Sequence, residues 1–161
     1  MGRWWCWMVT NIHEFGEDSS CSTEFRSWLG LIIIDSSILV PILRKKPAGL
    51  HQAQQLVNES IATTTISAFE LFFGAQSSQK REENLKAVEE LVQTFPVYPL
   101  SIEAAFIAGK VQHALITRGE KIELNDAYIA SIVLSLDGIL ATNNPKHFER
   151  IDGLKLYQFP D

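Results

Sequence analysis

The feature that most constrains the fold of this chain is a short apolar run that ends at an aspartate. Residues Leu31 to Ile34 are wholly apolar and mostly β-branched, which is typical of a strand buried on both faces of a sheet. Similar short runs alternate with helical patterns as far as the C-terminus. Strands separated by helices predict one α/β domain, with a mostly parallel sheet of about four to five strands flanked by helices.

The boundaries of the predicted elements follow from turn and capping residues. The predicted strands are residues 31–34, 61–64, 96–100, 139–142 and 155–157. The predicted helices are residues 38–43, 50–58, 67–75, 81–94, 102–117, 125–136 and 145–148. We expect Ser36 to cap the first helix, and Pro47 with Gly49 to end it. We expect Ser101 to cap the longest helix.

Residues 1–30 differ in composition from the rest of the chain. They contain all four tryptophans, both cysteines and a polar, partly acidic run at residues 17–24. We therefore expect residues 1–30 to be an N-terminal extension outside the fold, and residues 31–161 to form the domain. The alternative is an interaction arm whose tryptophans dock on a partner. Because Cys6 and Cys21 form neither a metal-ligand spacing nor a disulfide framework, the chain fits a reducing cytoplasm.

Composition and charge exclude several classes of protein. The chain has 161 residues, 46% of them hydrophobic and 20% charged, which is an ordinary globular composition with enough length to bury a core. No stretch approaches the roughly 20 apolar residues that a membrane-spanning helix needs. The formal net charge of −5 argues against non-specific duplex binding driven by bulk positive charge. A local basic patch or a metal ion is then needed to bring a phosphate backbone close.

Four polar residues lie where chemistry is expected in a parallel sheet. Asp35 and Asn144 follow predicted strands, and ligands bind outside the carboxyl ends of such strands. Glu70 lies among apolar side chains, where an unpaired carboxylate is costly unless a cation neutralises it. Asp126 opens a predicted helix. Carboxylate and amide oxygens suit Mg²⁺ or Mn²⁺, and carboxylates gathered at one edge repel each other without such a cation.

Each of these residues also has an ordinary structural alternative. Asp35 and Asn144 can cap the helices that follow them. Glu70 can lie on the exposed flank of its helix, and Asp126 can complement a helix dipole. No single one of the four is specific, so the signal lies in the set.

The four segments that carry these residues resemble the PIN-domain ribonucleases, and most closely the VapC toxins of prokaryotic type II toxin–antitoxin systems. The segments are residues 31–37, 64–75, 125–131 and 140–148, and they occur in the family's order. The match runs from about Leu31 to the C-terminus. As a set, these motifs are a strong signal.

The resemblance implies an endoribonuclease that depends on Mg²⁺ or Mn²⁺, with Asp35, Glu70 and Asp126 as metal ligands. Asn144 maps to the last position, where the family has Asp or Asn. Its amide is neutral, so the site has one negative charge fewer than with Asp, which concerns how tightly a second metal ion is bound. Thr142 matches a hydroxyl that the family often places nearby, and we expect it to contact the substrate. The family also implies 5′-phosphate and 3′-hydroxyl products, a homodimer and inhibition by a cognate antitoxin.

Residues near these motifs suggest how RNA reaches an acidic site. We expect Arg44, Lys45 and Lys46 to contact RNA phosphates, and the alternative is a solvated face. The phenylalanines of residues 69–73 have helical spacing, which favours core or dimer packing over a base-stacking platform. We assign His147 no role.

Rival functions fit less of the sequence. A phosphatase of the haloacid dehalogenase type needs a second Asp two residues after the first, and here that position is Ser37. A receiver domain needs an acidic pair that the sequence does not show, and a structure-specific DNA nuclease needs additional elements for which there is no room. A catalytically weak module that binds RNA or an antitoxin stays open as the alternative.

Overall fold

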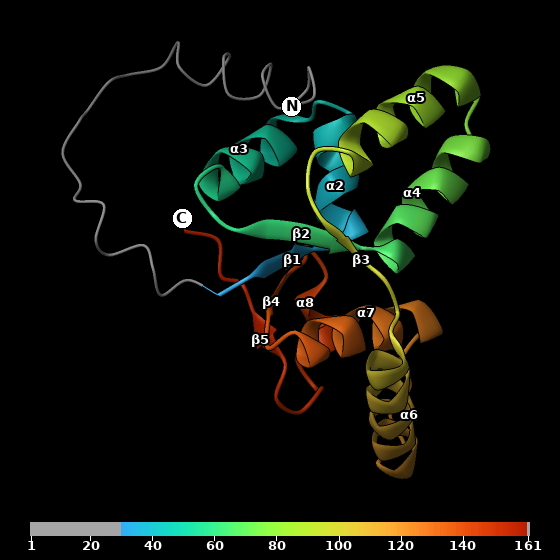
Figure 1. Ribbon diagram of the computed structural model, residues 1–161, viewed down its shortest axis with the longest axis vertical. Coiled ribbons are helices and arrows are strands. Elements are labelled where there is room, and N and C mark those ends of the chain that lie inside the picture. The colour runs from blue at the N-terminus through green and yellow to red at the C-terminus, as the bar shows by residue number, and fades with distance from the viewer. Residues whose placement is uncertain (1–29, 161) are drawn as a thin grey trace, which may run out of the picture.

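The computed structural model describes residues 30–160 and contains one five-stranded sheet (Figure 1). The strands are β1 (Ile32–Ile34), β2 (Ile61–Thr64), β3 (Val97–Tyr98), β4 (Ile139–Ala141) and β5 (Lys155–Leu156). Their order is β3-β2-β1-β4-β5, and every neighbouring pair runs parallel. Strand β1 therefore lies at the centre of the sheet, which explains why its sequence is apolar without alternation.

Helices cover both faces of the sheet (Figure 1). One face carries α2 (Ser36–Leu43), α3 (Pro47–Leu56), α4 (Thr65–Gln76) and α5 (Arg81–Val92). The other carries α6 (Ile102–Thr117), α7 (Leu124–Ser135) and α8 (Pro145–Phe148). Ile32 and Ile34 belong to the buried cluster on the first face, and Ile33 belongs to the cluster on the second. This alternation is the period of two that a strand imposes on its side chains.

The register of β1 and β4 decides which polar residues meet beyond the sheet. Ile34 pairs with Ala141, and the backbone N–H of Asp35 donates to the carbonyl oxygen of Ala141 at 2.9 Å. Asp35 and Thr142 are therefore neighbours at the carboxyl edge. On the opposite side of β1, the buried Thr63 hydroxyl donates to the carbonyl oxygen of Ile34 at 2.7 Å and fixes β2 to the same strand end.

The predicted fold class is confirmed, and two predicted helix boundaries were wrong. The residue that caps α2 is Asp35, not Ser36, because the Asp35 carboxylate accepts the backbone N–H of Ser36. Pro47 does not only end the preceding helix but opens α3, since the fixed φ of proline suits the first turn of a helix. Gly49 consequently lies inside α3.

The predicted N-terminal extension falls outside the described residues except for Gly30. The division of the chain into residues 1–30 and residues 31–161 therefore stays a prediction. Over residues 30–160, no helix is both long enough and apolar enough to cross a membrane.

Candidate functional site

The carboxyl ends of the central strands open onto an acidic cavity of about 430 Å³. The cavity is bounded by the β1–α2 junction, the middle of α4, the start of α7 and the loop that leads into α8. Its lining residues are Asp35, Ser36, Glu70, Glu123, Leu124, Asn125, Asp126, Asn144 and His147. All four polar residues that the sequence singled out are in this lining, although they come from segments far apart in the chain.

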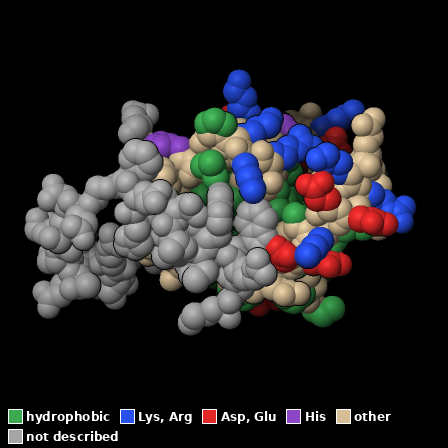
Figure 2. Space-filling model, turned by 90° about the horizontal axis from the view of Figure 1, so that it is seen from above, with side chains coloured by type: hydrophobic (Ala, Val, Ile, Leu, Met, Phe, Trp, Pro, Cys, Tyr) green, Lys and Arg blue, Asp and Glu red, His purple; other side chains and the backbone are tan. Residues whose placement is uncertain are grey.

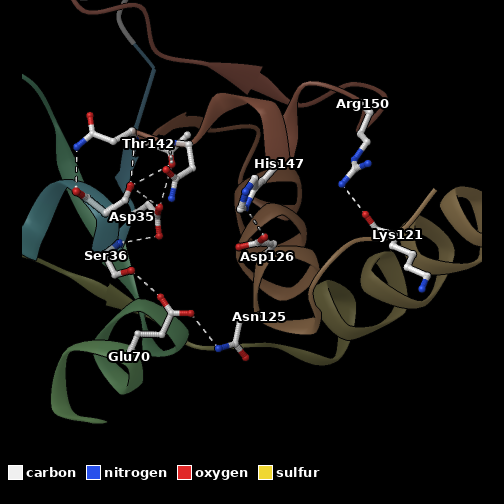
Figure 3. Close-up of polar contacts among 12 residues, drawn as sticks. Asp35, Ser36, Glu70, Lys121, Asn125, Asp126, Thr142, His147 and Arg150 are labelled. Carbon is white, nitrogen blue, oxygen red and sulfur yellow. Dashed lines mark hydrogen bonds and ion pairs between the residues drawn. The ribbon is translucent and has the colours of Figure 1, made fainter. Parts of the chain in front are cut away.

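The carboxylate of Asp35 is held by three hydrogen-bond donors (Figure 3). The backbone N–H of Ser36 donates to Oδ1 at 2.7 Å. The hydroxyls of Ser37 and Thr142 both donate to Oδ2, at 2.7 Å and 2.9 Å. Because Asp35 is only 5% exposed, these donors replace the water that an ionised carboxylate would otherwise bind.

Glu70 reaches the cavity from the second turn of α4. That helix begins at Thr65 because the Thr64 hydroxyl oxygen accepts the backbone N–H of Ser67 and caps it. The hydroxyl of Ser36 donates to Oε2 of Glu70 at 2.6 Å, and Nδ2 of Asn125 donates to Oε1 at 2.9 Å (Figure 3). Glu70 thus bridges the two helical layers, from α2 to α7.

Asp126 lies in the first turn of α7 and pairs with His147 of α8, with 3.1 Å between Oδ2 and Nδ1 (Figure 3). Burial raises the pKa of the Asp126 carboxyl, and the contact with His147 opposes this shift. The negative charges of Asp35 and Glu70 raise the pKa of Asp126 further. The three carboxylates therefore repel one another across the cavity, as a cation site does before its cation is bound.

Asn144 precedes α8 in the N-cap position, yet its side chain makes no capping hydrogen bond. Its amide therefore stays available at the cavity. Thr142, by contrast, is only 8% exposed, and its hydroxyl donates a hydrogen bond to Asp35. Thr142 is not among the residues that line the cavity, and its expected contact with the substrate stays a prediction.

The donors around the cavity fit a hard divalent cation. Three carboxylates and one amide oxygen are the ligand types that Mg²⁺ and Mn²⁺ take in proteins. Within residues 30–160, however, no three His, Cys, Asp or Glu side chains are gathered closely enough to hold an ion as they stand. All three carboxylates are instead hydrogen-bonded to neighbours. For an ion to bind, the contacts of Glu70 with Ser36 and Asn125 and the contact of Asp126 with His147 would have to adjust.

The predicted phosphate-binding residues lie away from this cavity. Arg44 ends α2, and the eight residues of that helix separate it from Asp35 by about 12 Å. Arg44 instead lines a groove between α2, α4 and α5, which adjoins the cavity because Glu70 lines both. Lys45 occupies the turn with a positive φ of 52°, and Lys46 caps α3. On the part of the face in Figure 2 that the described residues form, both Lys or Arg and Asp or Glu side chains are exposed.

The phenylalanines of α4 divide between two environments. Phe72 packs against the buried cluster on its face of the sheet. Phe69 and Phe73 are 55% and 65% exposed, and their rings stack on each other with 6.1 Å between centroids. These two residues are therefore not part of the core. Dimer packing stays a prediction for them, and a base-stacking platform stays its alternative.

Five lining residues were not among the residues singled out from the sequence: Ser36, Glu123, Leu124, Asn125 and His147. Asn125 and Ser36 each lie beside a predicted ligand, and both donate to Glu70. Adjacency to a predicted ligand was thus a signal available in the sequence. His147 carried no such signal, because only the packing of α8 on α7 brings it to Asp126.

The comparisons with known proteins show the family to which the chain belongs. The PIN domain family matches residues 32–154. The chain is 30% identical over 127 residues to ribonuclease VapC1 of Haemophilus influenzae (strain R2866), covering 78% of this chain and 95% of the relative. It is 29% identical over 123 residues to the tRNA(fMet)-specific endonuclease VapC of Shigella flexneri, covering 76% and 93%. The chain therefore belongs to the PIN domain family, and within that family to the VapC ribonucleases, as predicted.

Solved structures give the same relationship. VapBC2 from Rickettsia felis, bound to a DNA fragment from its promoter, matches with a TM-score of 0.73 and 28% identity, over 81% of this chain and 99% of that chain. DNA-bound VapBC from Salmonella typhimurium matches with a TM-score of 0.73 and 26% identity, over 80% and 98%.

Proposed function

We propose that this protein is a metal-dependent endoribonuclease and the toxin of a type II toxin–antitoxin system. The observation that carries the proposal is the convergence of Asp35, Glu70 and Asp126 in one cavity at the carboxyl edge of the sheet. Its relatives are named as ribonucleases, and the similar solved structures are VapBC complexes. We propose a cognate antitoxin and a second copy of the chain as its partners, and the cytoplasm as the place where it meets RNA.

We propose that Asp35, Glu70 and Asp126 hold Mg²⁺ or Mn²⁺, with the amide of Asn144 beside them. Such an ion supplies a water of lowered pKa and polarises a phosphodiester oxygen. The side chains of the protein keep the ion and the scissile phosphate in one place, which provides the orientation that an in-line displacement needs. The amide of Asn144 is free to donate to a phosphate oxygen, because it does not cap α8.

The proposed hydrolysis needs no reactant other than RNA and water. The oxygen of water joins phosphorus, the bond from phosphorus to the 3′ oxygen breaks, and one proton of the water ends on that 3′ oxygen. The products are a 5′-phosphate and a 3′-hydroxyl. A cavity lined by carboxylates repels a phosphodiester unless a cation neutralises it, so RNA binding and cleavage should both need the metal.

The direct test is cleavage of end-labelled RNA by the full chain in Mn²⁺ or Mg²⁺. We expect cleavage that stops in excess EDTA and leaves 5′-phosphate ends. Asp35→Asn and Glu70→Gln should each lower the rate at least about 100-fold, equivalent to about 3 kcal/mol of transition-state stabilisation.

The matched control is Glu103→Gln, which removes an exposed carboxylate from the first turn of α6, outside the cavity. This variant should cleave like the unaltered protein, and circular dichroism should show all variants folded. Full activity in EDTA would refute the metal role. Binding of RNA without turnover in any metal would favour the alternative, a binding module.

A further inference from the structure

Asn143, in the loop between β4 and α8, joins three parts of the structure. Its backbone N–H donates to Oγ of Ser37 at 2.9 Å, and its Nδ2 donates to the carbonyl oxygen of Ser37 at 2.9 Å. Its Oδ1 accepts Nε2 of Gln52, from α3, at 2.6 Å. An exposed loop residue with this many specific contacts is fixed in position, and through it the loop is fixed to the start of α2.

The neighbours of Oγ of Ser37 determine where its proton points. A hydroxyl has one proton, and Oγ of Ser37 already accepts the N–H of Asn143. Oγ of Ser37 lies 2.7 Å from Oδ2 of Asp35 and 3.2 Å from Oγ1 of Thr142, and its proton goes to the carboxylate, which is the nearer and the stronger acceptor. Thr142 repeats the arrangement, because its Oγ1 accepts the backbone N–H of Asn144 at 3.1 Å and donates to the same Oδ2.

The two carboxylate oxygens of Asp35 accept different numbers of hydrogen bonds. A carboxylate oxygen offers two acceptor positions, and both positions of Oδ2 are filled by Ser37 and Thr142. Within the part of the chain that the structure describes, Oδ1 accepts only the backbone N–H of Ser36. The one acceptor position of Asp35 that is open to a cation is therefore on Oδ1.

We infer that Asn143, braced by Gln52, is a positioning residue for the metal site: it orients the Ser37 hydroxyl onto Oδ2 of Asp35 and so reserves Oδ1 for the cation. The inference rests on the proposed function, because it takes Asp35 to be a metal ligand. Gln52 enters the arrangement through packing alone, since α3 lies against α2 and carries Gln52 to the loop that follows β4.

The test measures the dissociation constant of Mn²⁺ for the full chain by electron paramagnetic resonance, with no RNA present. Asn143→Ala should weaken Mn²⁺ binding about 10-fold, the usual effect of losing a residue that orients a metal ligand. Ser37→Ala should have a similar effect. Alanine at position 143 keeps the backbone N–H that donates to Oγ of Ser37 but loses the side-chain contacts to Ser37 and Gln52 that hold it in place. In the Ser37→Ala background, Asn143→Ala should therefore cause no further loss, because Asn143 acts on Asp35 through Ser37.

Asn84→Ala is the matched control, because it removes an Asn whose Nδ2 donates to Ser78, outside the cavity. It should leave the Mn²⁺ affinity unchanged, and the thermal midpoints of the metal-free variants should be similar. In cleavage assays, Asn143→Ala should raise the Mn²⁺ concentration for half-maximal rate about 10-fold and change the rate at saturating Mn²⁺ little.

Three results would overturn the inference. An unchanged Mn²⁺ affinity in Asn143→Ala would show that the residue does not position Asp35. Losses that multiply in the double variant would show that Asn143 does not act through Ser37. Absence of Mn²⁺ binding by the unaltered protein would overturn the metal role in the proposed function as well, and this outcome is distinct from the first two.

Discussion

At the scale of single residues, Asp35 and Asp126 each have two physical roles at once. Asp35 caps α2 with the same carboxylate that lines the cavity. Asp126 lies in the first turn of α7, where it complements the helix dipole, and it also faces the cavity. The structural and functional interpretations of these residues are therefore not alternatives. A helix N-terminus at the carboxyl edge of a sheet offers both roles to one side chain.

The raised pKa of Asp126 predicts a gain in stability when its charge is removed. Since the folded state holds this proton more tightly than an ordinary carboxyl with a pKa of 3.8, the free energy of unfolding falls as the pH rises past 3.8. Asp126→Asn cannot ionise, and its amide oxygen can still accept from His147. We expect the metal-free variant to be about 1 kcal/mol more stable at neutral pH by urea unfolding, and inactive in cleavage.

The free energies of unfolding of the unaltered protein and of Asp126→Asn should become more similar as the pH is lowered toward 3.8, because the Asp126 carboxyl is then protonated. A variant less stable than the unaltered protein at neutral pH would contradict the prediction. Added Mg²⁺ should stabilise the unaltered protein and have little effect on the variant, because ligand binding to the native state raises the free energy of unfolding.

At the scale of elements, the close approach of α2 and α3 determines what lies near the site. A Cβ atom on Gly49 would lie 2.5 Å from the backbone carbon of Pro41 and 2.7 Å from the backbone nitrogen of Ile42. Only glycine fits there, which is why a residue with poor helix propensity occurs inside α3. Such close packing holds α3 in the position from which Gln52 reaches Asn143.

Gly49→Ala should therefore destabilise the protein, although alanine favours helices. Separation of the two helices should cost about 1–3 kcal/mol, more than the roughly 0.5–1 kcal/mol gained from helix propensity. Gly109→Ala in α6 is the control, since nothing lies within 4 Å of the added Cβ there. Urea unfolding should show a lower free energy of unfolding for Gly49→Ala and a higher one for Gly109→Ala. A stabilising effect of Gly49→Ala would contradict the prediction.

At the scale of the whole molecule, the acidic cavity depends on both helical layers. Glu70 comes from α4 on one face of the sheet, and Asp126 comes from α7 on the other. Asp35 and Asn144 follow the two adjacent central strands between them. The site exists only when both layers are packed on the sheet, so loss of either layer would remove a carboxylate from it.

The exposed pair Phe69 and Phe73 predicts self-association through α4. Burying a phenylalanine contributes about 1.5–3 kcal/mol, and two from each copy suffice for a substantial contact. We expect light scattering to give twice the chain mass of 18.1 kDa for the unaltered protein. The double variant Phe69→Lys, Phe73→Lys should give the mass of one chain. Ile116→Lys, at the exposed C-terminal end of α6, should leave the dimer intact, and a dimeric double variant would exclude this face.

The sequence by itself determined the alternation of strands and helices, the burial of the strand at residues 32–34 on both faces, and the residue types that suit a hard cation. These properties depend on apolar patterning and turn residues, which are local. Tertiary structure alone decided the hydrogen bond from Thr142 to Asp35, the pairing of Asp126 with His147 and the bracing of Asn143 by Gln52. Hydrogen bonds between residues 21 to 107 positions apart depend on strand register and helix packing, and no local pattern encodes either.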